Sequence, residues 1–306
     1  MVEKQKVDVA IIGGGPAGLS AALVLGRARK QVVVIDEGRP RNAVTHETHG
    51  FLTRDGIQPG EFRRIAKEEI SAYPSVSIIG DAAVSITGTD GAFQIETEQG
   101  TRFTSKKVLF TVGMKDRPLD IPGLAEVYGK SAFVCPFCDG WELRDEPIVV
   151  INKGPELMHF IPLLSGWTNR LTICSNGPDE LTDAEREELR RHHVSVYASP
   201  INLIDSSDGI VQQVILEDGT TIPCRAIFFK PGLAIGSALP QALGCRLTDT
   251  GAVVVDELGK TNVAGVYSAG DAASRMHQAI AAASAGSLAA AILSSELNME
   301  AWRQTE

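Results

Sequence analysis

Short apolar runs alternate with helical patterns along much of the chain, which is the arrangement of an α/β protein. Residues 7–12 form an apolar run suited to a buried parallel strand, residues 17–29 are a helix pattern rich in Ala and Leu, and residues 31–35 form a β-branched strand. These segments predict one strand–helix–strand unit. A second unit of this kind is predicted at residues 148–151, 156–167 and 170–174.

Shorter elements surround these two units. Gln99-Gly100 and Asp218-Gly219 each predict a turn between two antiparallel strands. The shorter predictions are strands at residues 93–98 and 101–110, an exposed charged helix at 185–192, strands at 211–217 and 220–222, a short strand at 252–255, and an Ala-rich helix after residues 265–271. The two strand–helix–strand units indicate that one nucleotide-binding design is used twice.

Composition restricts the class of protein. The 306 residues are enough for one large or two ordinary domains, and 43% hydrophobic with 22% charged residues is typical of a soluble globular protein. The net charge of -9 would repel nucleic acid and anionic membranes. No apolar stretch approaches the roughly 18 residues that span a bilayer, and the first residues lack the order of a signal peptide. We therefore expect a cytoplasmic protein that binds neither nucleic acid nor membrane.

A glycine motif stands between the first predicted strand and helix. Gly13, Gly15 and Gly18 have the spacing that allows a tight turn, close approach of the backbone to a pyrophosphate, and close packing of helix on strand. Asp36 closes the second strand, where a carboxylate can accept hydrogen bonds from ribose hydroxyls. The segment predicts a dinucleotide site, with a tight turn that binds no ligand as the alternative.

The chain has five cysteines, an odd number that does not indicate a disulfide framework. Cys135 and Cys138 have the spacing of a redox-active dithiol. Half a zinc site or two core thiols are the alternatives, but a zinc site needs four ligands, and no second Cys-x-x-Cys or close His pair accompanies this one. We expect no metal. Cys174, Cys224 and Cys245 are expected to be buried small hydrophobic residues.

Four segments together resemble a known family. GGGPAGLSAA from Gly13, the Thr111-Val112-Gly113 segment, Cys-x-x-Cys-Asp-Gly from Cys135 and GVYSAGD from Gly265 resemble the low-molecular-weight thioredoxin reductases over essentially the whole chain. The resemblance implies an α/β fold with two Rossmann-like, three-layer ββα dinucleotide-binding domains. It implies a homodimer, with the domains divided as a discontinuous FAD domain of residues 1–117 and 247–306 and a central cysteine-bearing domain of residues 118–246.

The same resemblance implies bound FAD. Asp271 would place its carboxylate on the ribityl chain of the flavin, and the backbone of the following helix would lie near the isoalloxazine. The residues expected to bind FAD are Gly13, Gly15, Pro16, Ala17, Gly18, Asp36, Glu37, Asn42, His49, Gly113, Gly270, Asp271, Gln278 and Ala279.

The resemblance also implies roles for the cysteine motif. Cys138 would lie beside the flavin as a thiolate, Cys135 would exchange with the substrate, and Asp139 would supply or accept the proton. Attack of a thiolate on a disulfide needs a proton for the leaving sulfur, and partial burial raises the pKa of a carboxyl.

The second nucleotide loop departs from the family pattern. The reductases carry Gly-x-Gly-x-x-Ala there, but in this chain Asn152 and Leu157 replace the first and last of these residues, so that only Gly154 remains. Glu156 would compete with a pyrophosphate for the helix amides. The next strand is followed by the acidic residues 179–180 instead of a basic cluster that grips NADPH. We interpret the nicotinamide site as lost, and a divergent but working site is the alternative.

This combination resembles the FAD-dependent dithiol oxidases that close disulfides in natural products of the gliotoxin and holomycin type. We expect oxidation of a small-molecule dithiol through Cys135 and Cys138, with O2 or a redox protein as electron partner and no direct use of NADPH. The first alternative is a reductase of thioredoxin or a similar small protein disulfide, fed by NADPH through a divergent site or by ferredoxin. The second is a non-enzymatic flavin-binding or redox-sensing protein.

A dithiol oxidase needs a base that deprotonates the incoming thiol, and imidazole titrates in the right range. His46, His49 and His277 lie in regions expected to border the flavin. Packing or surface roles are the alternative for each of them. His277 is our first choice for the catalytic base.

Overall fold

The computed structural model describes residues 5–304, which divide into two compact units. Of the described residues, the first unit holds 5–43, 50–116 and 233–304, and the second holds 44–49 and 117–232. Residues 233–246, which we expected in the central domain, therefore group with the first unit. The reason is that Leu239, Leu243 and Cys245 pack against the core of the first unit.

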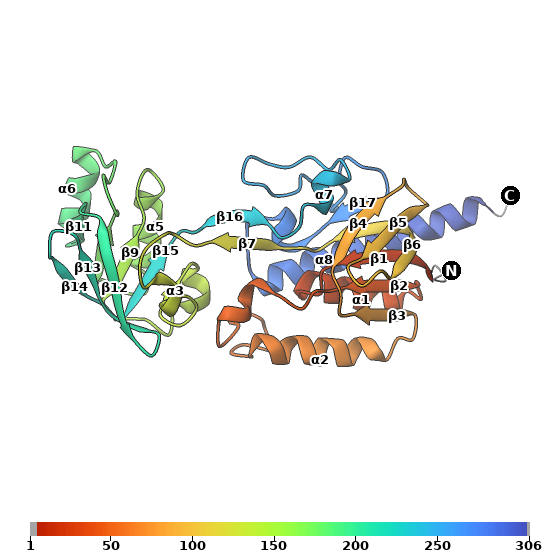
Figure 1. Ribbon diagram of the computed structural model, residues 1–306, viewed down its shortest axis with the longest axis horizontal. Coiled ribbons are helices and arrows are strands. Elements are labelled where there is room, and N and C mark those ends of the chain that lie inside the picture. Colours follow the sequence, from red (N-terminus) through yellow and green to blue (C-terminus); the bar gives the residue numbers. More distant parts are fainter. Residues whose placement is uncertain (1–4, 305–306) are drawn as a thin grey trace. The chain divides into compact units, whose positions relative to one another are not determined.

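The first unit is built on a seven-stranded sheet (Figure 1). Its strands are β1 (Gln5–Ile12), β2 (Val32–Ile35), β3 (Val76–Ile79), β4 (Ala83–Thr87), β5 (Phe93–Thr97), β6 (Arg102–Phe110) and β17 (Val266–Ser268). The order is β3-β2-β1-β6-β5-β4, and β17 also pairs with β6. Five strands are parallel, whereas β4 and β5 add to the sheet in antiparallel fashion. The parallel strands end together, which places the loops that follow them at one edge.

Two long helices pack together in the core of the first unit. These are α1 (Pro16–Arg27) and α8 (Ala279–Arg303), and a Cβ on Gly286 of α8 would lie only 2.0 Å from the carbonyl oxygen of Ala17. The close approach therefore needs glycine at position 286. The remaining helical segments of this unit are α2 (Pro59–Ser71), α7 (Leu239–Ala242), η2 (Gly270–Ala273) and η1 (Arg41–Val44), of which the last residue, Val44, groups with the second unit.

Helix α8 corrects one expectation about membranes. By length and hydropathy alone its 25 residues could cross a bilayer, whereas we expected no stretch that is long enough. The reason for the difference is that Ser284, Gly286 and Ser287 interrupt the apolar pattern without ending the helix. Its buried side chains, including Ala289 and Leu293, pack into the core with α1, which is the behaviour of a core helix.

The second unit repeats the parallel arrangement on a smaller scale. Its five parallel strands lie in the order β11-β10-β9-β15-β8, and β12, β13 and β14 form a separate antiparallel sheet. The strands are β8 (Ala132–Phe133), β9 (Ile148–Ile151), β10 (Leu171–Cys174), β11 (Ser195–Tyr197), β12 (Ile201–Ser207), β13 (Ile210–Leu216), β14 (Thr221–Pro223) and β15 (Ala226–Phe229). The helices are α3 (Leu124–Val127), α4 (Pro136–Asp139), α5 (Leu157–Leu164) and α6 (Asp183–Arg191). The predicted pair of Rossmann-like units is confirmed.

Two connecting strands carry the chain between the units. They are β7 (Met114–Arg117) and β16 (Gly232–Ile235), which pair with each other in a two-stranded sheet. The predicted strand at residues 252–255 is wrong, because only Val253 forms a bridge, to Leu247. A turn at Gly251, with φ of +82°, and a second turn in which Asp256 accepts from two backbone N–H groups leave no room for a longer ladder.

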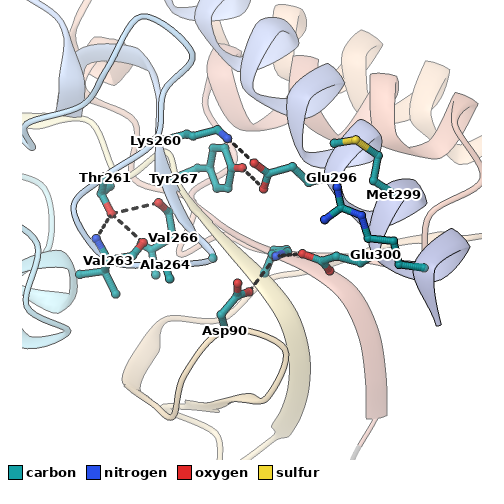
Figure 2. Close-up of a pocket in the computed structure, with 13 residues that line it drawn as sticks. Asp90, Lys260, Thr261, Val263, Ala264, Val266, Tyr267, Glu296, Met299 and Glu300 are labelled. Carbon is teal, nitrogen blue, oxygen red and sulfur yellow. Dashed lines mark hydrogen bonds and ion pairs between the residues drawn. The ribbon is translucent and has the colours of Figure 1, made fainter.

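A pocket of about 370 Å³ lies beside the start of β17 and the last turns of α8 (Figure 2). Lys107, which is only 2% exposed, donates to Asp90 at 2.8 Å and to Glu300 of α8. Tyr267 of β17 donates to Glu296 of the same helix. A buried lysine is tolerated only when it is paired. These pairs therefore fasten α8 to the sheet.

Candidate functional site

The three glycines of the loop after β1 have different steric surroundings. A Cβ on Gly13, whose φ is +109°, would lie 2.3 Å from the carbonyl oxygen of Thr111, and a Cβ on Gly18 would lie 2.0 Å from that of Gly13. These two positions make the turn and bring α1 close to the strand. A Cβ on Gly15 would meet none of the described protein atoms within 4 Å. This side of the loop is open, and the backbone there can approach a pyrophosphate.

Asp36 ends β2 beside the loop, and the protein already uses both of its oxygens. Oδ1 accepts from the backbone N–H of Gly14 at 3.1 Å and of Gly38 at 3.3 Å, whereas Oδ2 pairs with Arg63 of α2. Nε of Arg63 is buried and has no hydrogen-bond partner among the described residues. A buried donor without a partner costs about 1–3 kcal/mol. This donor fits an acceptor supplied by a bound ribose.

The late Gly-Asp segment packs against the same loop. Gly270 has φ of +75°, and a Cβ there would lie 2.9 Å from the Cβ of Ala17 in the first turn of α1. Asp271 follows, with a side chain that is 20% exposed. Burial raises the pKa of the Asp271 carboxyl, and the neighbouring Arg41 opposes that rise. The structure thus places Asp271, the residue expected to bind the ribityl chain, in a segment that packs against the glycine loop expected to bind the pyrophosphate.

His277 lies beside Asp271 with both ring nitrogens engaged. Nη1 of Arg41 donates to Nδ1 of His277 at 2.8 Å, and Nε2 of His277 lies 3.1 Å from the carbonyl oxygen of Ser274. A guanidinium can only donate, so Nδ1 accepts and Nε2 carries the proton. Service as a base for substrate thiols would require one of these bonds to break.

Cys135 and Cys138 are joined by a disulfide at the start of α4, with Cα atoms 5.3 Å apart. The carbonyl oxygen of Cys135 accepts from the N–H groups of Cys138 at 3.1 Å and of Asp139 at 3.2 Å, which closes the turn. A Cβ on Gly140 would lie 3.0 Å from the ring of Trp167. The glycine after the motif therefore lets α4 pack closely on this indole.

Asp139 has the acid–base character that the sequence predicts. Burial raises the pKa of this carboxyl from 3.8 to about 7, the charge of Glu142 adds to the rise, and His49 opposes it. Nε2 of His49 lies 3.2 Å from Oε2 of Glu47 and 3.8 Å from Oε1 of Glu142. A carboxyl with a pKa near neutrality can both accept and return a proton. The role of Asp139 in proton transfer stays a prediction that this raised pKa supports.

The loop after β9 uses its own backbone amides. The N–H of Lys153 donates to the side chain of Asn152 at 2.8 Å, and the N–H of Gly154 donates to the carbonyl oxygen of Asp179 at 3.2 Å. A Cβ on Gly154 would lie 3.3 Å from Oε2 of Glu180. A phosphate at this loop would therefore meet engaged amides and a carboxylate.

The side chains at the start of α5 also contact other protein residues. Leu157 is fully buried in the core of the second unit, and Glu156 pairs with Lys230. The whole unit is acidic, with 18 Asp and Glu against 10 Lys and Arg residues over 44–49 and 117–232. Such a field disfavours the 2′-phosphate of NADPH.

The structure sorts the predicted residues into two groups. The first unit contains Gly13, Gly15, Pro16, Ala17, Gly18, Asp36, Glu37, Asn42, Gly113, Gly270, Asp271, His277, Gln278 and Ala279. Glu37 is exposed on its surface. The second unit contains Cys135, Cys138 and Asp139, together with His49, which we expected at the cofactor. The other three cysteines are free and buried.

Sequence reasoning missed three charged residues at these sites, namely Arg41, Arg63 and Glu142. Arg41 contacts partners that lie 75 and 230 positions away in the chain, so no local motif reveals it. Arg63 acts on Asp36 from α2, 27 positions away. Glu142 follows the cysteine motif closely, and its distance of three residues from Asp139 was a signal that could have been used.

Comparisons with known proteins agree with this geometry. The family model described as pyridine nucleotide-disulphide oxidoreductase matches residues 7–286. The chain is 31% identical over 310 residues to thioredoxin reductase tcpT of Claviceps purpurea, and the match covers 95% of this chain and 94% of the relative. The chain belongs to the pyridine nucleotide-disulphide oxidoreductase family. Within it, this protein is a thioredoxin reductase-like flavoprotein and an oxidoreductase.

Two solved structures share the whole fold. The putative thioredoxin reductase TrxB from Bacillus anthracis matches with a TM-score of 0.92 and 38% identity, covering 96% of this chain and 99% of that one. The protein HlmI matches with a TM-score of 0.92 and 31% identity, covering 100% and 96%. The cofactor of this family is FAD, and the first unit fits it through the open face of Gly15, the buried donor of Arg63 and the carboxylate of Asp271.

Proposed function

We propose that this protein oxidises a dithiol to a disulfide through Cys135 and Cys138, with FAD and O2 as acceptors and without direct use of NADPH. The observation that carries the proposal is the contrast between the two nucleotide loops. The loop at Gly15 is open, whereas the loop at Gly154 has engaged amides and the carboxylate of Glu180 against it. The resemblance of the sequence to dithiol oxidases of the gliotoxin and holomycin type supports the same direction of electron flow.

The sulfur chemistry follows from the cysteine pair. A substrate thiolate attacks Sγ of Cys135, the Cys135–Cys138 bond breaks, and Cys138 leaves as a thiolate. The second substrate thiol loses its proton and attacks the mixed disulfide, so that the substrate leaves as a disulfide and Cys135 as a thiol. Two electrons then reside on the cysteine pair. FAD held by the first unit would supply a two-electron acceptor for them, with O2 as the final acceptor and hydrogen peroxide as the product.

Asp139 handles the proton in this scheme. In its ionised form the carboxylate accepts a proton from a substrate thiol, and it returns that proton to the sulfur of Cys135 as the product leaves. The pKa of about 7 makes both directions accessible near neutral pH. We therefore assign the base to Asp139 in preference to His277, whose ring nitrogens are both engaged.

The acidic second unit restricts the substrate. The second unit, which holds the cysteine pair, has eight more acidic than basic residues, and this net negative charge favours an uncharged or cationic dithiol over an anionic one. The proposal includes a homodimer, by resemblance to the thioredoxin reductases, and a cytoplasmic protein that binds neither nucleic acid nor membrane.

Oxygen uptake tests the proposed function. The holoprotein with excess dithiothreitol and no nicotinamide should consume O2 and form one hydrogen peroxide per disulfide. Cys135→Ser should remove this activity, whereas Cys245→Ala, which changes a free buried cysteine of the first unit, should retain it. Absence of O2 uptake with both neutral and cationic dithiols would contradict the proposal.

A disulfide reductase is the second candidate, because the curated relative from Claviceps purpurea is named a thioredoxin reductase. In that case the same cysteine pair would pass electrons outward, from NADPH or from a ferredoxin-like donor. Reduction of thioredoxin that depends on one of these donors would favour it.

A further inference from the structure

We infer that Arg41 is a positioning residue of the FAD site, whose guanidinium holds Asp271 and His277 in place and ties them to the segments where the chain leaves the first unit. The inference rests on the FAD site of the proposed function. It does not depend on the direction of electron flow or on the substrate.

One guanidinium reaches three side chains. Nε and Nη2 of Arg41 donate to the two oxygens of Asp116, at 2.9 Å and 2.6 Å. Nη1 lies 2.8 Å from Nδ1 of His277 and 3.4 Å from Oδ2 of Asp271. Only the planar fork of arginine supplies this many donors in fixed directions, and lysine offers a single charged centre.

The partners are partly withdrawn from water. The side chain of Asp116 is 7% exposed, and those of Arg41 and Asp271 are each 20% exposed. Hydrogen bonds to charged groups are stronger than neutral ones, and partial burial weakens screening. The guanidinium is a positive group that the carboxylates of Asp116 and Asp271 share.

Arg41 and Asp116 both lie close to points where the chain passes from the first unit into the second. Arg41 lies three residues before Val44, where the chain enters the second unit, and Asp116 is the last residue before it enters again at Arg117. The Arg41–Asp116 pair therefore fixes both of these segments to each other. The bonds to Asp271 and His277 fix them in turn to the flavin-binding segment.

Loss of Arg41 should alter two chemical properties at the site. Arg41 opposes the rise in the pKa of Asp271 that burial causes, and Asp116 adds to that rise. Removal of Arg41 therefore favours the protonated form of Asp271, a weaker acceptor for ribityl hydroxyls. It also frees Nδ1 of His277, so the single Nε2–H tautomer is no longer enforced.

The test compares Arg41→Gln and Arg41→Lys with the control Arg64→Gln. Arg64 is an arginine of α2 in the same unit that is 60% exposed and pairs with Glu61 and Glu68 on the surface. FAD affinity is measured on apoprotein by flavin fluorescence, and the His277 tautomer by 15N NMR of the holoprotein. We expect FAD binding to weaken by about 10-fold or more in Arg41→Gln, by a smaller factor in Arg41→Lys, and not in Arg64→Gln.

The His277 signal separates positioning from general destabilisation. Wild type and Arg64→Gln should show one Nε2–H tautomer, and Arg41→Gln at saturating FAD should show a mixture of the two tautomers. Unchanged FAD affinity together with an unchanged tautomer would overturn the inference. If Arg41→Gln does not fold, Arg41→Lys decides by the same two readouts, because it keeps the positive charge. Both measurements remain decisive even if the wild type oxidises no dithiol, so the two proposals fail independently.

Discussion

The carboxylate of Glu180 lies against Gly154, so close that a Cβ on this glycine would be 3.3 Å from Oε2. Gly154 is the glycine that remains of the second nucleotide loop, and its N–H already donates to the carbonyl oxygen of Asp179. A phosphate that approaches here would meet repulsion and no unengaged amide at this position. Beyond the substitution of two small residues, this relationship gives a physical reason to expect that the loop does not bind a nicotinamide cofactor.

Replacement of Leu157 by alanine should not restore NADPH use, even though alanine is the family residue at that position. Leu157 is fully buried, so Leu157→Ala should leave a cavity and lower the free energy of unfolding by about 2–5 kcal/mol. Urea unfolding and an NADPH titration of the flavin check both parts. The control Leu203→Ala, at a side chain 38% exposed, should cost less than about 1 kcal/mol. Flavin reduction by NADPH in Leu157→Ala would show that the loop can still bind nucleotide.

The two glycines of the first loop should respond differently to alanine. Gly15→Ala adds a methyl group that meets none of the described protein atoms, so the protein should fold with near-normal stability but lose FAD affinity. In Gly18→Ala the methyl group would lie 2.0 Å from the carbonyl oxygen of Gly13, so folding itself should suffer. Thermal unfolding of the apoproteins and FAD titration separate these effects. Equal stability of both apoproteins would contradict this division of tasks.

The rate of dithiol oxidation should rise with pH through the titration of Asp139, with a midpoint near pH 7, because only the ionised carboxylate accepts a proton from the substrate. Glu142→Gln removes a charge that raises the pKa of Asp139, so the midpoint should move to lower pH. His49→Asn removes a group that lowers it, so the midpoint should move to higher pH. The pH profile of single-turnover exchange with dithiothreitol checks both directions.

The control for these shifts is Glu146→Gln, since Glu146 is not among the groups that act on the pKa of Asp139. Its profile should match that of the wild type. Shifts of Glu142→Gln and His49→Asn in the same direction would show that another group controls the rate.

Asp139 should also make stability depend on pH. Its folded pKa of about 7 lies above the ordinary value of 3.8, so the native state holds the proton more tightly than the unfolded chain. The stabilisation from this proton is complete below pH ~4 and is lost as the pH rises through ~7. Its contribution to the free energy of unfolding is at most about 4 kcal/mol. Asp139→Asn should therefore gain stability relative to the wild type between pH 5 and pH 8. The urea midpoints of Asp139→Asn and the wild type at pH 5 and pH 8 measure this difference. Equal changes of the two midpoints between these pH values would contradict it.

The two cysteines should give different products with substrate. Cys138→Ser leaves Cys135 as a nucleophile without a resolving partner, so incubation with an oxidised small-molecule disulfide should yield a stable mixed disulfide on Cys135. Cys135→Ser should give little of this adduct if Cys138 is the inner sulfur. Intact-protein mass spectrometry detects the added mass. Preferential labelling in Cys135→Ser would reverse the roles assigned to the pair.

Much of the fold could be predicted because local signals determine it. The strands of both nucleotide-binding units are short apolar runs between glycine turns, and the Gly13–Gly18 spacing identifies its own helix start. The strand predicted at residues 252–255 failed because two tight turns, set by Gly251 and Asp256, override its β-branched residues. Residues 233–246 followed the first unit because of where Leu239 and Cys245 pack, a tertiary preference that no local pattern carries.

The site was predictable only as far as its motifs extend. The disulfide pair and Asp139 are adjacent in sequence, so their grouping could be predicted. The partners that set their chemistry come from elsewhere, as His49 does with Glu142, 93 positions further along the chain. Such contacts depend on how long-range elements meet, and a single sequence carries no periodic signal for them. Arg41 and Arg63 were missed for the same reason.

Anaerobic titration of the purified flavoprotein tests the central claim most directly. NADPH, NADH and dithiothreitol are added in turn while the flavin absorbance is followed. We expect dithiothreitol to bleach the flavin and neither nicotinamide to do so, because a phosphate at the Gly154 loop would meet the carboxylate of Glu180. Rapid and stoichiometric bleaching by NADPH would contradict the account and identify this protein as a working NADPH-dependent disulfide reductase.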